Sequence, residues 1–197
     1  MARVIVFDVI ETLLDLRPLQ EPFVRVFGDP APVGEWFARL LHGSLVATVT
    51  NTYEDFGTIG QRALDVVASR RDRDLSDDDR AAILGTVGRL PPHPEVFGAL
   101  ERLRSAGFPL ATLTNSSGQV VRMQLEHAGL AGFFDRTLSV EEVRRYKPAP
   151  EPYLMAANRL GVEPSEMSHP ATKGWMVVRQ SETMRHHADL GNHPRGG

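Results

Sequence analysis

An aspartate near the start of the chain stands directly after a short apolar run, and its position suits chemistry. The run is VIVF, residues 4–7, and Asp8 follows it. A continuous, β-branched run of this kind is typical of a strand buried on both faces of a parallel sheet. Because open α/β sheets bind ligands at the carboxyl ends of their strands, Asp8 is placed where it could take part in binding or chemistry. An ordinary turn beginning at Asp8 explains this stretch alone equally well.

Two more polar segments follow predicted strands further along the chain. Thr114 and Asn115 come after the apolar stretch 108–113, and Lys147 precedes a proline in a basic segment. Singly they could be a helix-capping turn and a surface lysine. Since the carboxyl ends of parallel strands share one edge of a sheet, we expect these segments to meet Asp8 there. Together they would supply a nucleophile, polar donors and a cation that attracts an anionic substrate.

The elements that would position these residues form an α/β pattern interrupted by helices. Four helical patterns precede the prolines at 91–94, and the fourth has a capping-box spacing at Ser76 and Asp79. Strands and helices alternate afterwards, which is typical of a doubly wound parallel sheet. We therefore predict an α/β core with an inserted helical cap and a disordered tail. The predicted bounds are 1–15 and 91–179 for the core, 16–90 for the cap and 180–197 for the tail.

Composition restricts the function classes. The chain has 197 residues, a formal net charge of -3 and no cysteine. The charge offers no basic surplus to bind a phosphate backbone, so we expect no nucleic-acid partner. Without cysteine there is no disulfide framework, thiolate nucleophile or thiolate metal site. No apolar run is long enough to span a bilayer, so we expect no membrane partner and a cytoplasmic location.

Three motifs resemble those of the haloacid dehalogenase superfamily and, within it, the type II or L-2-haloacid dehalogenases. They are FDVIETLLD, LTNSS and YKPAPEPY, in this order and separated by the helical stretch. The resemblance runs over residues 1–165. It implies that Asp8 displaces halide from the carbon next to the substrate carboxylate, and that water then hydrolyses the aspartyl ester.

The resemblance also implies roles for the residues around the nucleophile. Thr12 and Thr114 would orient the aspartate or bind the substrate carboxylate, and Asn115 would line the halide side. Lys147 would balance charge. Tyr153, in the helix that follows, matches a tyrosine of the family's substrate pocket.

The chain departs from the family pattern at two positions near the predicted site. The family has an arginine soon after the cap tryptophan; Phe37 stands there, and Arg39 is the candidate substitute. At Ile10 the dehalogenases often have tyrosine or asparagine. The superfamily's phosphatases typically carry Asp-x-Asp at the first motif. Their second aspartate donates a proton, and Mg²⁺ is their cofactor. Ile10 cannot donate a proton, and halide leaves without one, so the resemblance implies no cofactor.

The pattern also changes near Met167. The family's fourth motif is an apolar strand, a polar turn and an aspartate, commonly after tryptophan, whereas SHPATKGWMVV places Met176 after Trp175. Our hypothesis is that the reading frame or gene end is altered near Met167, which gives an atypical or truncated C-terminus and weakens activity. Mass spectrometry of natively expressed protein and resequencing of the gene would disprove this by showing an authentic, ordered tail.

We predict a hydrolase that acts on carbon-halide bonds and converts a short-chain 2-haloacid, a small anionic substrate, to the 2-hydroxy acid without a cofactor. A Mg²⁺-dependent small-molecule phosphatase is the second alternative. A catalytically impaired homologue that binds only a small carboxylate or a protein partner is the third. The apolar cap helices suit packing on the core or a homodimer, and periodicity does not choose between them.

Overall fold

A parallel sheet forms the centre of the computed structural model, which describes residues 4–168. Within this range the sheet has four strands in the order β3-β2-β1-β4. In register, Val6 lies opposite Ala111, and Val4 opposite Met167. The inner strands β1 and β2 are flanked on both sides, which explains their apolar sequences. The bounds are β1 (Val4–Phe7), β2 (Leu110–Thr114), β3 (Arg136–Ser139) and β4 (Met167–Ser168).

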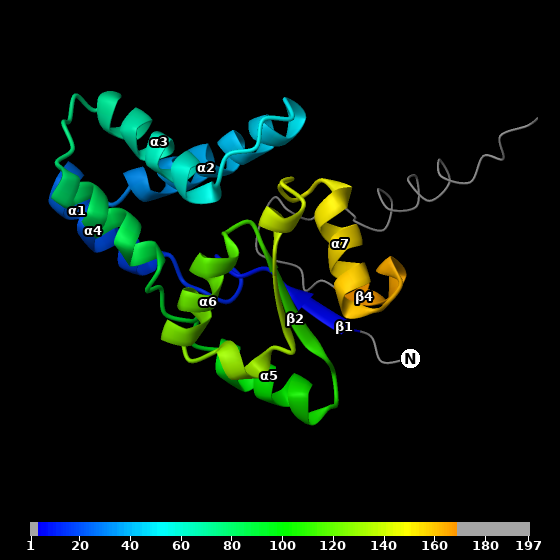
Figure 1. Cartoon of the computed structure of the whole chain (residues 1–197). Coiled ribbons are helices and arrows are strands. Elements are labelled where there is room, and N and C mark those ends of the chain that lie inside the picture. The colour runs from blue at the N-terminus through cyan, green and yellow to red at the C-terminus, as the bar shows by residue number, and fades with distance from the viewer. Residues whose placement is uncertain (1–3, 169–197) are drawn as a thin grey trace, which may run out of the picture.

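After the run of helices that follows β1, helices alternate with strands and cover the sheet. Both α6 and α7 contact β3, and in Figure 1 α5 and α6 lie on one side of the strands while α7 lies on the other. The predicted doubly wound α/β fold is confirmed. These three helices are α5 (Val96–Ser105), α6 (Gly118–His127) and α7 (Pro150–Leu160).

The other four helices follow one another between β1 and α5. They pack mainly on each other, α2 against α3 and α1 against α4, and Figure 1 shows them gathered at one end of the molecule. We call residues 17–87 the helical segment; that it forms a cap with the bounds 16–90 stays a prediction. Its helices are α1 (Gln20–Phe27), α2 (Pro32–Val49), α3 (Phe56–Ser69) and α4 (Asp77–Val87).

Local interactions explain how the helical segment is ordered. Trp36 is buried and its Nε1–H donates to the Gly60 carbonyl oxygen at 2.9 Å, which joins α2 to α3. The predicted capping box at the start of α4 is confirmed: the Asp79 N–H donates to Ser76 Oγ at 3.1 Å, and the Ser76 N–H donates to Asp79 Oδ2 at 3.2 Å. Such a cap satisfies backbone donors that the helix itself leaves unpaired.

The carboxyl-terminal part of the prediction is only partly covered by the structure. The sequence pattern does not predict β4, because two residues are too few to show an alternation of apolar and polar positions. The predicted disorder at 180–197, the departure at Met176 and the altered tail lie outside the described residues. Across residues 4–168, no helix has both the length and the apolar character that a membrane crossing requires.

Candidate active site

The three polar segments that we expected to meet at the sheet edge do lie together. Lys147 Nζ is 2.8 Å from Asp8 Oδ1 and donates to the Leu113 carbonyl oxygen at 2.6 Å. The Lys147 backbone N–H donates to Asn115 Oδ1 at 3.1 Å. Asp8 follows β1, Asn115 follows β2, and Lys147 lies in the loop after β3, so the parallel order of the strands brings them to one edge.

The Asp8 carboxylate is held through one of its oxygens. Oδ1 accepts the Val9 N–H at 2.7 Å and the ion pair with Lys147. None of the residues from 4 to 168 donates a hydrogen bond to Oδ2. The Asp8 side chain is 19% exposed, whereas that of Lys147 is only 4% exposed. A cation this deeply buried is tolerated only with a partner, and the geometry leaves the second carboxylate oxygen ready for attack.

Two threonine hydroxyl groups lie close in sequence to the candidate site residues: Thr12 follows Asp8, and Thr114 precedes Asn115. Thr114 Oγ1 accepts the Ser116 N–H at 3.2 Å, which fixes the turn after β2. Thr12 Oγ1 is buried and, among the described residues, lacks a hydrogen-bond partner. An unpaired buried hydroxyl is costly, so this group suits a bound ligand. Tyr153 is buried on α7. Substrate contacts by these residues stay predictions.

Arg39 takes part in an ion-pair cluster within the helical segment. Its Nε donates to Glu35 Oε1 at 2.9 Å on its own helix, and Arg71 Nη1 of α3 donates to Glu35 Oε2 at 2.7 Å. This cluster occupies Arg39 with a protein carboxylate. Its role as the substitute for the family arginine stays a prediction.

The Glu35 cluster gives a pH-dependent stability test. The hydrogen bonds from Arg71 and then Arg39 hold the pKa of Glu35 below its ordinary 4.5. A carboxyl group with a lowered folded-state pKa stabilises the protein above its unfolded-state pKa and loses this contribution as the pH falls through the folded value. We expect Glu35→Gln to lower the free energy of unfolding by about 1 kcal/mol at neutral pH and by less below about pH 4.5.

Urea denaturation of both proteins over this pH range measures the difference. Glu21→Gln is the matched control, since Glu21 is exposed and its nearest Arg25 nitrogen is 3.9 Å away. A Glu35→Gln effect that is equal at every pH would contradict the assignment.

A second set of contacts ties the helical segment to the loop that carries Lys147. The Tyr146 N–H donates to Thr48 Oγ1 at 3.1 Å, and the Tyr146 hydroxyl donates to the Glu54 carbonyl oxygen. Tyr53 stacks on the Tyr146 ring at 5.3 Å between centroids. Burial raises the pKa of Tyr146, which keeps its hydroxyl protonated and able to donate. These contacts fix the backbone immediately before the buried lysine.

We expect Tyr146→Phe to lower the free energy of unfolding by about 1–2 kcal/mol, because the Glu54 carbonyl oxygen loses its buried donor. Tyr146→Leu should cost more, since it also removes the ring that stacks on Tyr53. Urea denaturation of the three proteins measures both losses. Equal stability of wild type and Tyr146→Phe would show that the hydroxyl contact contributes nothing.

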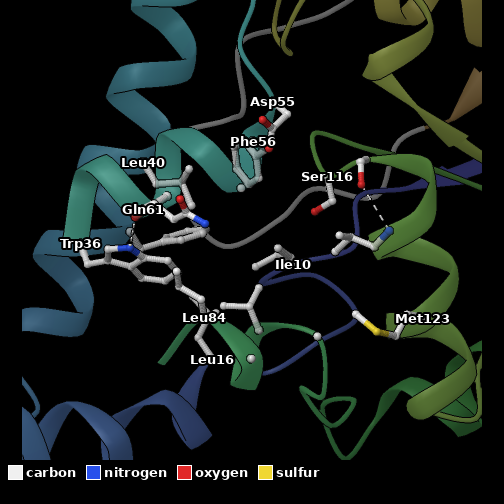
Figure 2. Close-up of a pocket in the computed structure, with 18 residues that line it drawn as sticks. Ile10, Leu16, Trp36, Leu40, Asp55, Phe56, Gln61, Leu84, Ser116 and Met123 are labelled. Atoms are coloured by element: carbon white, nitrogen blue, oxygen red, sulfur yellow. Dashed lines mark hydrogen bonds between the residues drawn. The ribbon is translucent and has the colours of Figure 1, made fainter. Parts of the chain in front are cut away.

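A mainly apolar cavity of about 200 Å³ lies between the helical segment and the core. Figure 2 shows Trp36, Leu40 and Leu84 on one side, Ser116 and Met123 on the other, and Ile10 between them. Ile10 and Ser116 closely follow Asp8 and Asn115 along the chain, so the two loops that carry these candidate site residues also contribute to the cavity wall. The remaining lining residues are Leu16, Phe37, Asp55, Phe56, Gly57, Gly60, Gln61, Gly85, Val87, Gly88, Ser117 and Val120.

The sequence analysis does not predict this cavity or most of its lining. The predicted site residues are absent from the lining, and Phe37, which stands where the resemblance implies an arginine, is part of it. Apolar residues such as Leu84 and Val120 recur at helical spacing, which is the pattern of any packed core. Nothing in that pattern distinguishes a cavity wall from a filled interior.

Comparisons with known proteins agree on one family. The model of the haloacid dehalogenase-like hydrolases matches residues 2–169. (S)-2-haloacid dehalogenase 1 from Pseudomonas sp. (strain CBS-3) is 31% identical over 177 residues, covering 89% of this chain and 78% of the relative.

Solved structures give the same result. An L-2-haloacid dehalogenase structure is 27% identical with a TM-score of 0.87, covering 92% of this chain and 82% of that chain. The L-2-haloacid dehalogenase from Xanthobacter autotrophicus is 26% identical with a TM-score of 0.80, covering 86% and 69% of the two chains.

Proposed function

The chain belongs to the haloacid dehalogenase-like hydrolases, and we propose that it hydrolyses a short-chain 2-haloacid to the 2-hydroxy acid. One observation carries the proposal: Lys147 holds Oδ1 of Asp8 at the carboxyl end of the sheet, and the described residues leave Oδ2 without a donor. The similarity to (S)-2-haloacid dehalogenases supports this substrate class and a preference for the S enantiomer.

The reaction proceeds in two steps on Asp8. Oδ2 attacks C2 of the haloacid, the new O–C2 bond forms, and halide leaves with the electron pair of the carbon-halogen bond. Water then attacks the carboxyl carbon of the ester. The bond between that carbon and the ester oxygen breaks, the 2-hydroxy acid leaves, and one proton is released. Asp8 is regenerated as a carboxylate with one oxygen from water.

The surrounding residues position the substrate in this proposal. Lys147 pairs with the Asp8 carboxylate and attracts the substrate monoanion. The Thr12 hydroxyl, which has no hydrogen-bond partner among residues 4–168, and the Asn115 amide are the proposed contacts to the carboxylate and the halide. Thr114 supports the turn after β2, and Tyr153 is a further proposed contact to the substrate.

The helical segment is proposed to close over the sheet edge as a cap, with Arg39 beside it. No cofactor is proposed: halide departs without protonation, and a monoanionic acid can approach a carboxylate without a metal bridge. Ile10, at the position where a phosphatase needs a proton donor, supports dehalogenation over the phosphatase alternative.

Two other predictions from the sequence belong with this function. A cytoplasmic location stays a prediction. A homodimer also stays a prediction; Val46 and Val49 of α2 are 45% and 85% exposed in the structure, which is compatible with such an interface.

The test is chloride release from each enantiomer of 2-chloropropionate in a chelating buffer without added metal. Equimolar chloride and lactate would support the proposal, and a single turnover in ¹⁸O-water should place the label in Asp8. Magnesium-dependent release of phosphate from a phosphate monoester, without chloride release, would favour the phosphatase. Stabilisation by the haloacid without turnover would favour a binding homologue.

A further inference from the structure

We infer that the cavity between the helical segment and the core receives the alkyl substituent on C2 of the substrate. The protein should therefore favour 2-haloacids with a propyl or butyl substituent, such as 2-bromohexanoate, over 2-bromopropionate. The inference rests on the proposed function and concerns the substrate class that the same site selects.

The charge of the cavity wall disfavours the carboxylate and the halide of a haloacid inside the cavity. Among the described residues that line it, none is lysine, arginine or histidine. The one charged group is Asp55, which begins α3 and accepts the Thr58 N–H at 2.9 Å and the Thr58 hydroxyl. Although burial opposes it, these bonds keep the pKa of Asp55 below its ordinary value. An anionic carboxylate or a departing halide would meet this negative charge without a compensating cation.

Some polar groups of the wall are engaged within the protein. The Trp36 Nε1–H donates to Gly60, and Ser117 Oγ accepts the Val120 N–H at 3.3 Å. Gln61 and Ser116 add polar side chains, but most of the cavity wall is formed by aliphatic and aromatic groups. Such a surface gains from contact with alkyl carbon, because burying apolar area releases it from water.

The size of the cavity sets the length of the substituent. An apolar cavity of about 150 Å³ is enough to hold a six-carbon ring, and the cavity here has about 200 Å³. The methyl group of a 2-halopropionate would leave most of this space empty. A butyl group would fill much more of it.

The position of the cavity fits the geometry of the reaction. Ile10 follows Asp8 by two residues in the loop after β1, and in Figure 2 it lies between the two walls of the apolar space. A substrate with its carboxylate among the polar groups and C2 at Asp8 would direct its substituent past Ile10. Polar and apolar ends of the substrate then match the two sides of the site.

The first test compares kcat/KM for 2-bromohexanoate and 2-bromopropionate, which share one leaving group. Each buried methylene should raise kcat/KM by about fourfold, so the longer acid should be favoured by about 60-fold. Equal values, or a preference for 2-bromopropionate, would overturn the inference.

The second test introduces a larger side chain into each of the two walls of the cavity. Leu84→Phe on α4 and Val120→Phe on α6 should each lower the ratio of the two kcat/KM values by at least about tenfold, because the added ring takes up the space for the butyl group. Two variants on separate elements guard against misfolding of either. Leu154→Phe is the matched control, since Leu154 is 45% exposed on α7 and does not line the cavity. An unchanged ratio in a folded cavity variant would disprove the assignment.

A binding measurement separates this inference from the proposed reaction. If neither bromoacid releases bromide, the dehalogenase function fails, and calorimetry with 2-hydroxyhexanoate and lactate then tests the cavity alone. Binding of the longer acid by about 60-fold more tightly would support the cavity assignment. Equal affinities would overturn it.

Discussion

Asp8→Asn is expected to lower halide release by at least about a thousandfold, to the level of the uncatalysed reaction. An amide oxygen is a far weaker nucleophile than a carboxylate oxygen, and no ester can form at the normal rate. Asparagine can still accept the Val9 N–H that Asp8 Oδ1 accepts at 2.7 Å. The fold should therefore be kept, so that the loss reflects chemistry.

The measurement is halide release from 2-chloropropionate together with circular dichroism of each protein. Glu11→Gln is the matched control, because Glu11 is an exposed acid in the same loop. The control should release halide at the wild-type rate. Full halide release by folded Asp8→Asn would exclude Asp8 as the nucleophile.

Lys147→Met is expected to lower kcat/KM by about a hundredfold or more, since the attacking carboxylate and the substrate anion lose the cation between them. Methionine fills a similar volume but cannot donate to the Leu113 carbonyl oxygen or pair with Asp8. Breaking this ion pair should also lower the free energy of unfolding by about 2–3 kcal/mol. That is the low end for a buried pair, because Asp8 is partly exposed.

A double-mutant cycle with Asp8→Asn tests the coupling. The double variant should be more stable than the sum of the two single losses, because neither charge is left unpaired. Arg104→Met is the control, since the Arg104 pair with Asp135 is exposed and its loss should cost less than about 1 kcal/mol. Additive losses at Asp8 and Lys147 would show that the 2.8 Å contact has little energetic weight.

The sequence by itself determined the α/β pattern of the core and the group of residues at the edge of the sheet. Asp8 and Asn115 each follow an apolar run, and Lys147 stands in a basic segment further along the α/β pattern. Because parallel strands share one carboxyl edge, local pattern was enough to predict that the three residues meet. The capping box of Ser76 and Asp79 could likewise be predicted from the sequence, because its two partners lie on one helical turn. The roles given to these residues came from the resemblance to a family.

Only the tertiary structure decided the contacts between segments distant in sequence. The Arg39 and Arg71 bonds to Glu35, and the Tyr146 contacts with the loop before α3, depend on how whole helices pack. The cavity depends on the same packing, because its walls come from the helical segment, the loop after β1 and α6. The sequence shows which side chains are apolar. The space that remains between packed elements depends on how those elements are arranged in three dimensions.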